Sequence, residues 1–208
     1  MKIQVFSPCV NVFEVLYLCK RARLLINKGV FYHNRGIFMT VIEAIRKRYS
    51  CRAYIDRPIE QEKLGQLFEA ARLAPSAKNL QDWRFVVVRD KEKKQQVAES
   101  TNHPEVFGKA GVIIAACSNS NDVMRCGQAA GPIDVAIALE HICLQATELG
   151  LATCWIGSFE PEKVRKVLKI PQDVAIIELM ALGYPADKAK KPQREPIEKI
   201  MCYEKWEF

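Results

Sequence analysis

The sequence of 208 residues lacks the short motifs that mark the commonest nucleotide and metal sites. It contains neither a Gly-x-Gly-x-x-Gly nor a Walker A sequence, which argues against a Rossmann or P-loop nucleotide site. None of its eight cysteines form a Cys-x-x-Cys pair, the spacing that zinc ribbons and iron–sulfur clusters need. The three histidines, His33, His103 and His141, are scattered, and no nucleophile with a neighbouring base can be recognised. We expect His141, on an apolar helix, to be a core histidine with a hydrogen-bond partner.

Long apolar runs and internal repeats are also missing. The apolar run near the N-terminus, residues 10–19, is interrupted by Asn11 and Glu14 and is too short to cross a bilayer. Eight cysteines without close pairs are typical of reduced, structural thiols. This cysteine usage predicts a cytoplasmic protein.

The formal net charge of +7 is concentrated at one end of the chain. Residues 1–38 carry six of the 31 basic residues and one of the 24 acidic ones, so the rest carries 25 and 23. Because the remainder is nearly neutral and has no basic stripe with interleaved aromatic residues, we expect neither nucleic acid nor membrane as a partner.

Residues 1–38 are an uncertain N-terminal extension. They could form a short basic amphipathic helix over residues 11–28. The hypothesis we favour is that the start codon is mis-assigned and that translation begins at Met39, because residues 35–38 can be encoded by a purine-rich ribosome-binding sequence. Thr40-Val41-Ile42-Glu43 follows at once and has the pattern of a helix capping box.

From Met39 onward, helical and strand patterns alternate over one domain, residues 39–208. Helices are predicted over 40–49, 60–74, 91–100, 132–150 and 161–168, and strands over 83–89, 111–117, 154–156 and 174–182. Helix 132–150 is apolar on nearly every face, which predicts a central, buried helix. The sequence therefore indicates an α+β fold, with a central mixed or antiparallel sheet flanked by helices. The polar tail ends in Ile200, Tyr203, Trp206 and Phe208, which suggests burial against a second subunit.

The stretch Arg48-Tyr49-Ser50-Cys51-Arg52 places two guanidinium groups and a hydroxyl within five residues, as phosphate binding requires. Taken alone, it could equally be a solvated basic helix end that complements the helix dipole. A second stretch follows two dozen residues later, between a predicted helix and a predicted strand. It reads Pro75-Ser76-Ala77-Lys78-Asn79-Leu80-Gln81-Asp82-Trp83.

In this order and at this spacing, the two stretches resemble the nitroreductase-like family of FMN-dependent oxidoreductases. The resemblance implies that Arg48, Tyr49, Ser50 and Arg52 hold the FMN phosphate and an edge of the flavin, with Tyr49 where an arginine or histidine is common. It also implies that a loop of the neighbouring subunit approaches the same flavin. The matching loop residues are Pro75, Ser76, Ala77, Asn79 and Gln81, while Asp82 replaces the usual proline before Trp83.

Two later segments continue the resemblance, which covers most of the chain from Met39 to Arg194. Residues 148–159 resemble the family segment along one flavin face, and this assigns Trp155, Ile156, Gly157 and Ser158 to the cofactor. Residues 182–196 resemble the closing strand and basic loop, whose Lys191 and Arg194 return to the phosphate. Asp134, near the start of the buried helix, is expected to serve the helix dipole, with a role near the flavin as the alternative.

The resemblance implies a homodimer that exchanges its C-terminal tails. It would take hydride from NADH or NADPH and reduce a nitroaromatic, a quinone or a similar electron-poor small molecule by ping-pong kinetics. The FMN carries the chemistry, so no catalytic protein residue and no metal are expected. Residues 119–131 are a short lid candidate, which favours a small, permissive pocket. The alternatives are a flavin-binding or regulatory module without turnover, and a nucleic-acid binder that uses the basic N-terminal arm.

Overall fold

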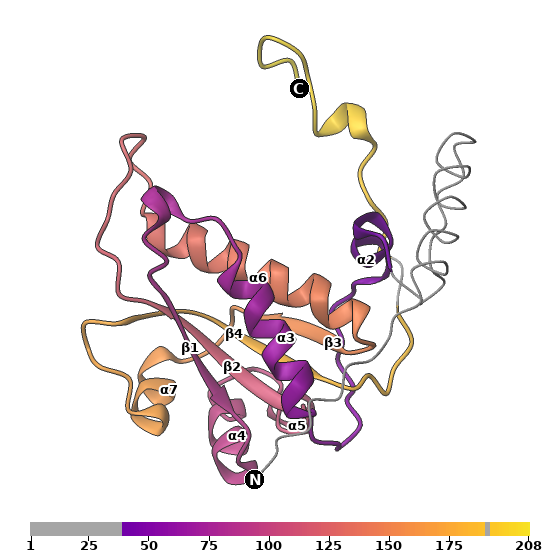
Figure 1. The fold of residues 1–208 in the computed structure, drawn as a ribbon, viewed down its shortest axis with the longest axis vertical. Coiled ribbons are helices and arrows are strands. Elements are labelled where there is room, and N and C mark those ends of the chain that lie inside the picture. Colours follow the sequence, from indigo (N-terminus) through magenta and orange to yellow (C-terminus); the bar gives the residue numbers. More distant parts are fainter. Residues whose placement is uncertain (1–38, 190–191) are drawn as a thin grey trace, which may run out of the picture. The chain divides into compact units, whose positions relative to one another are not determined.

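The computed structural model describes residues 39–189 and 192–208. The predictions for residues 1–38 therefore lie outside the described residues. Figure 1 shows a sheet with helices on both of its faces. The helices are α2 (Val41–Lys47), α3 (Gln61–Arg72), α4 (Lys91–Ala98), α5 (Pro104–Phe107), α6 (Ala130–Glu148) and α7 (Pro161–Leu168), with short 3-10 turns at η1 (Ala77–Asn79) and η2 (Ile197–Lys199).

The sheet contains β1 (Trp83–Val88), β2 (Val112–Ser118), β3 (Ala152–Ile156) and β4 (Ala175–Gly183). Their order is β1-β2-β4-β3, and each neighbouring pair is antiparallel. The β2–β4 register shifts between Ala116 and Cys117, as at a β-bulge. The predicted α+β class is thus confirmed, and its sheet is antiparallel rather than mixed.

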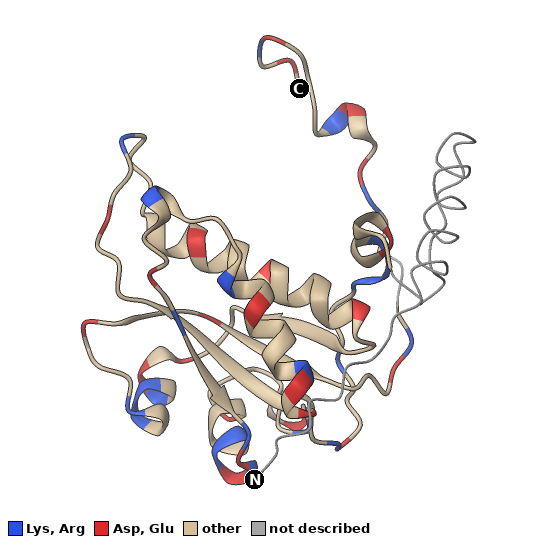
Figure 2. Cartoon of the chain, viewed as in Figure 1, with Lys and Arg blue, Asp and Glu red and all other residues tan. Residues whose placement is uncertain are grey.

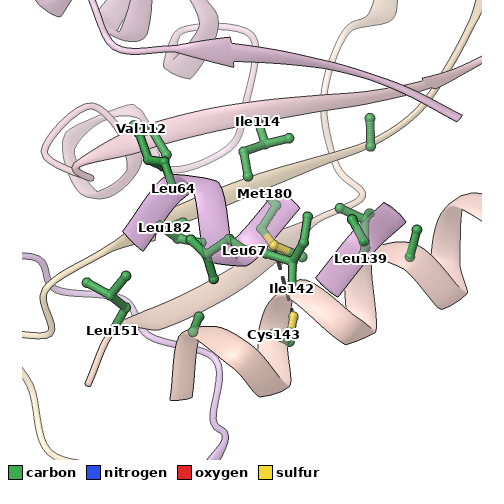
Figure 3. Close-up of a cluster of buried hydrophobic side chains, with 14 of the residues drawn as sticks. Leu64, Leu67, Val112, Ile114, Leu139, Ile142, Cys143, Leu151, Met180 and Leu182 are labelled. Atoms are coloured by element: carbon green, nitrogen blue, oxygen red, sulfur yellow. Dashed lines mark hydrogen bonds between the residues drawn. The ribbon is translucent and has the colours of Figure 1, made fainter. Parts of the chain in front are cut away.

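Alternate residues of the two central strands belong to different hydrophobic clusters, because successive side chains of a strand point to opposite faces. On one face Ile114 and Met180 pack with α3 and α6 (Figure 3). On the other face Ile113 and Leu179 pack with residues of α4, α5 and α7. This explains why β2 is buried at every position and is apolar from Val112 to Cys117. Figure 2 shows that charged residues of both signs lie on the outer helices α4 and α7, whereas the strands carry little charge.

Helix α6 begins at Ala130, two residues before the predicted start at Pro132. Its buried residues form one continuous face from Ala130 to Ala146, while Ile133 stays exposed. The prediction of a buried helix therefore holds for one face only. Asp134 lies beyond the first turn of the helix, so its expected role in complementing the helix dipole is wrong.

The start of α2 agrees with its predicted capping box. The Thr40 N–H donates to Glu43 Oε2 at 2.8 Å, and the Glu43 N–H donates to Thr40 Oγ1 at 3.4 Å. The helix ends at Lys47, earlier than expected, and Arg48 is its C-cap. The short helix α5, with Pro104 at its first position, has no counterpart among the predicted elements.

Gly183, at the end of β4, passes very close to the start of β2. A β-carbon at this position would lie 2.7 Å from the Gly111 nitrogen and 3.1 Å from the Tyr54 ring, so only glycine fits without a shift. The following residues then run beside residues 53–55: the Ile55 N–H donates to the Tyr184 carbonyl at 2.9 Å, and the Ala186 N–H to the Ala53 carbonyl at 2.8 Å. This close approach brings the chain after β4 next to the chain after α2.

Candidate flavin phosphate site

The stretch after α2 is fixed to the outer strand β3. Ser50 forms an isolated parallel bridge with Thr153, and the Cys51 N–H donates to the Thr153 carbonyl at 2.9 Å. The Cys51 side chain is fully buried, whereas Ser50 and Arg52 on either side are exposed. A buried anchor between two exposed polar residues thus holds Ser50 and Arg52 at the surface.

A cavity of about 350 Å³ lies between this stretch and the chain after β4. It is lined by Arg48, Tyr49, Ser50, Arg52, Asp187, Lys188, Pro192 and Arg194. Four of these side chains are basic and one is acidic, so the cavity carries an excess of positive charge. Guanidinium groups form charge-assisted and often bidentate hydrogen bonds with phosphate, and a lysine adds a point charge. The chemistry of this lining fits a phosphate monoester.

The acidic residue of the cavity, Asp187, is bonded to the stretch across from it. Its Oδ1 accepts from the Tyr49 hydroxyl at 2.8 Å and lies 3.2 Å from Cys51 Sγ, and its Oδ2 accepts from the Arg52 N–H at 3.2 Å. Burial raises the pKa of Asp187, but the hydrogen bonds from Tyr49, Arg52 and Cys51 outweigh it, so the net shift is downward. Burial, with the bond to Asp187 as the next cause, raises the pKa of the Tyr49 phenol. Asp187 is thus ionised near neutral pH, and Tyr49 keeps its proton.

The loop after α3 has an unusual backbone. Lys78, Asn79 and Gln81 have φ angles of 53°, 56° and 56°, in the left-handed region that non-glycine residues seldom occupy. The loop is closed on itself by the Gln81 N–H, which donates to Ser76 Oγ at 3.0 Å. Such strain persists only where the surrounding structure fixes the backbone, and it is concentrated at functional sites.

Asp134 supplies the main anchor of this loop to the core. Its side chain is 4% exposed, and both carboxylate oxygens lie 3.1 Å from the Ala77 nitrogen, which donates to them. A second contact, from Lys78 Nζ to Asp122 at 2.9 Å, joins the loop to residues 119–131. Asp134 therefore holds the loop that carries Ser76 and Asn79 against α6.

The end of β3 presents a small, open stretch of backbone. Trp155 Nε1 donates to Cys143 Sγ at 3.2 Å and Ile156 is buried, whereas Gly157 and Ser158 are exposed. Beneath Gly157 lies Glu178, whose Oε1 is buried and has no hydrogen-bond partner among the described residues. Burial raises the pKa of Glu178. Since Ser50 is bridged to β3 and this stretch follows β3, both are attached to the same edge strand of the sheet.

The structure thus brings together five of the predicted cofactor residues, Arg48, Tyr49, Ser50, Arg52 and Arg194, in one cavity. Lys191 lies outside the described residues. The predicted residues Pro75, Ser76, Ala77, Asn79, Gln81, Trp155, Ile156, Gly157 and Ser158 do not line that cavity. Sequence reasoning missed Asp187, Lys188 and Pro192; the basic character of the loop could have indicated Lys188, and no pattern indicated Asp187.

In residues 39–189 and 192–208, no three His, Cys, Asp or Glu side chains are grouped as metal ligands. His141 has the expected hydrogen-bond partner, since its Nδ1 lies 3.0 Å from the Ala70 carbonyl, but it is only partly buried and its expected place in the core is wrong. No helix in the described part of the chain is long and apolar enough to cross a membrane.

Comparison with known proteins identifies the fold and the family. The family model described as Nitroreductase family matches residues 45–103 and 94–184. A nitroreductase family protein from Clostridium difficile has a similar structure, with a TM-score of 0.73 and 32% identity over 81% of this chain and all of that one. The chain belongs to the nitroreductase family.

Two relatives show what this family contains. An NADH dehydrogenase from Thermus thermophilus is 30% identical over 192 residues, covering 77% of this chain and 94% of that protein. An FMN reductase [NAD(P)H] from Bacillus subtilis is 29% identical over 178 residues, covering 77% of this chain and 72% of that protein.

Proposed function

We propose that the chain is an NAD(P)H-dependent FMN oxidoreductase that reduces an electron-poor small molecule such as a nitroaromatic or a quinone. The observation that carries this proposal is the basic cavity, in which two segments about 140 residues apart in sequence place Arg48, Arg52, Lys188 and Arg194 around one space of about 350 Å³. Membership of the nitroreductase family supports the same conclusion.

The residues around the cavity would hold the phosphate end of FMN. A phosphate monoester carries about two negative charges at neutral pH. Hydrogen bonds to charged groups contribute about 1.5–3 kcal/mol each, so a few well-formed contacts from these side chains are enough for tight binding. Arg48 also lies 3.8 Å from Glu140 on α6, which limits the positions its guanidinium can take. The bridge between Ser50 and Thr153 holds the Ser50 backbone beside the arginines.

FMN, when bound, supplies the hydride-accepting centre, and the protein supplies position and electrostatics. The exposed backbone at Gly157 and Ser158 starts from the same strand that anchors Ser50, so it is suited to support the ring system of a flavin whose phosphate lies in the cavity. The Ser158 hydroxyl accepts a hydrogen bond from Asn102 Nδ2 at 2.7 Å, which limits the freedom of this stretch.

A second subunit would complete the site. The loop of residues 75–81 does not line the cavity of its own chain, which supports its contribution to the site of a partner. Helix α2 exposes Val41, Ile42 and Ile45, and the C-terminal residues Tyr203 and Trp206 are 71% and 83% exposed. Monomeric proteins seldom expose so many large apolar side chains, and a homodimer with exchanged tails would bury them.

The acceptor and the kinetic order belong to the same proposal. Residues 119–131 are short, with Val123 bridged to Ala129 and Asp122 paired with Lys78, so they leave room for donor and acceptor to bind in turn over the flavin. Alternate binding in one pocket gives ping-pong kinetics, which appear as parallel lines in double-reciprocal plots. Intersecting lines would contradict this order.

The first experiment is the visible spectrum of the purified protein, before and after addition of NADH or NADPH without oxygen. A flavin band that one donor bleaches is expected, and it would identify that donor. A flavin band that neither donor bleaches would indicate a binding module instead of an enzyme. Protein that remains colourless even after incubation with FMN would refute the proposed function.

A further inference from the structure

The phosphate cavity contains one acidic side chain, Asp187, among four basic ones. An acid in such a place is unexpected, because a carboxylate repels a bound phosphate when it is free to act on it. Asp187 is not free in this sense. Its two carboxylate oxygens are directed to the Tyr49 hydroxyl, the Cys51 thiol and the Arg52 N–H, all within 3.2 Å.

These contacts lie where two distant parts of the chain meet. Residues 184–188, named here the closing segment, run beside residues 52–55 through the bond from the Ile55 N–H to Tyr184 and the bond from the Ala186 N–H to Ala53. Asp187 comes next and attaches the segment to residues 49–52. Beyond this point the chain continues to Arg194, which lines the cavity.

We infer that Asp187 is a positioning residue: its carboxylate holds the closing segment against residues 48–52 and so assembles the two halves of the phosphate cradle. This inference rests on the proposed function and deepens it, since it names the residue that builds the anion site. It also gives Tyr49 a defined task. Where the family often has a basic residue, Tyr49 donates its hydroxyl to Asp187 and thereby joins the two halves.

Simple electrostatics and this positioning role predict opposite changes in FMN affinity for the same substitution. If Asp187 acts only through its charge, Asp187→Asn removes a repulsion and FMN binds more tightly. If Asp187 holds the cradle together, the substitution weakens the attachment, the basic side chains lose their common geometry, and FMN binds less tightly. The direction of the change therefore decides between the two.

The test compares dissociation constants for FMN and for riboflavin, which lacks the phosphate, by quenching of flavin fluorescence. We expect Asp187→Ala and Asp187→Asn to weaken FMN binding by about tenfold or more, because hydrogen bonds to a charged group are lost. Riboflavin binding should change much less than FMN binding, because riboflavin has no phosphate for the cradle to hold. Asp56→Asn is the matched control: it makes the same chemical change four residues after Arg52, on a side chain that does not line this cavity. FMN binding by Asp187→Asn as tight as that of the unchanged protein, or tighter, would overturn the inference.

Hydrogen exchange of the flavin-free protein is the second readout. The Arg52 and Ala186 amides donate across the junction, so both should exchange several-fold faster in Asp187→Asn. Unaltered exchange at both amides would also overturn the inference. This measurement needs no flavin, so a failure of the unchanged protein to bind FMN would refute the proposed function while exchange still judges the role of Asp187. Tyr49→Phe, which removes one hydroxyl and no charge, gives the same two readouts if the Asp187 variants do not fold, with smaller effects expected.

Discussion

Replacing Asp134 by alanine should loosen the loop of residues 75–81 while leaving the sheet intact. The Asp134 carboxylate is buried in α6 and accepts the Ala77 N–H with both oxygens at 3.1 Å. A hydrogen bond to a charged group contributes about 1.5–3 kcal/mol, although the cost of burying the carboxylate offsets part of this. We expect Asp134→Ala to lower the free energy of unfolding by about 2 kcal/mol, which corresponds to a fall in Tm of about 4–8 °C in a domain of 150–250 residues.

The local effect should exceed the global one because the loop is strained. Lys78, Asn79 and Gln81 occupy the left-handed region, at a cost of about 1–2 kcal/mol for each ordinary residue. The anchor at Ala77 is one of the few contacts that offset this cost. Once it is removed, the loop should open without global unfolding, and trypsin should cleave after the exposed Lys78 many times faster than in the unchanged protein.

Two further variants calibrate this result. Asp134→Asn keeps an acceptor for the Ala77 N–H but removes the charge, so its effect should be about half as large. Lys78→Gln removes the exposed ion pair with Asp122, which should contribute no more than about 1 kcal/mol. A Tm for Asp134→Ala within about 1 °C of the unchanged protein, together with unaltered cleavage after Lys78, would refute the reasoning.

Three other predictions concern charge and protonation. Arg48→Ala should weaken FMN binding by about 10- to 150-fold, the equivalent of one charge-assisted hydrogen bond, as measured by fluorescence titration. Burial raises the pKa of Glu178 above its ordinary 4.5, so the unchanged protein should lose stability as pH rises from about 4.5 through the folded-state pKa. Glu178→Gln should lack this loss. Its urea midpoint, compared with that of the unchanged protein at the same pH, should therefore rise between pH 4.5 and pH 8. In native protein at pH 8, alkylation followed by mass spectrometry should label Cys126, which is exposed, and spare Cys51 and Cys143, whose pKa values burial raises to about 11.

Each of these has its own control and its own contrary result. Arg46→Ala removes an exposed arginine two residues before Arg48, and it should leave FMN binding unchanged. Equal losses in both variants would mean that net charge matters and geometry does not. A parallel pH dependence of stability in Glu178→Gln and the unchanged protein would show that another group titrates. Labelling of Cys51 as fast as Cys126 in the native state would contradict its burial.

The core was predictable because its signals are local and repeated. The apolar run of β2 and the apolar face of α6 reflect burial that many residues share, so an error at one position does not hide the pattern. Boundaries were less certain: α6 begins at Ala130 because nothing forces the helix to start at Pro132, and α5 has only four residues. Short elements leave too few positions for a period to be recognised.

The site could be predicted only in part. The five residues from Arg48 to Arg52 form a dense local cluster of phosphate-binding groups, so their role could be suggested in advance. Asp187 could not be recognised, because its partner Tyr49 lies 138 residues away and a single aspartate has no periodicity. The same is true of Asp134, whose partner is a backbone N–H; its position near the start of a helix suggested an interaction with the dipole instead.

Helix α2 has a consequence for how ligand binding and assembly are coupled. It has seven residues and buries only Ala44, and a helix of this length is not stable by itself in water. Its C-cap is Arg48, so the position of this proposed phosphate-binding residue depends on the helix being formed. If the exposed Val41, Ile42 and Ile45 are covered by a second copy of the chain, covering them and binding FMN stabilise the same turn of helix. Thermodynamic linkage then requires that FMN binding strengthens self-association and that self-association strengthens FMN binding by the same factor. The apparent affinity for FMN should therefore fall as the protein is diluted.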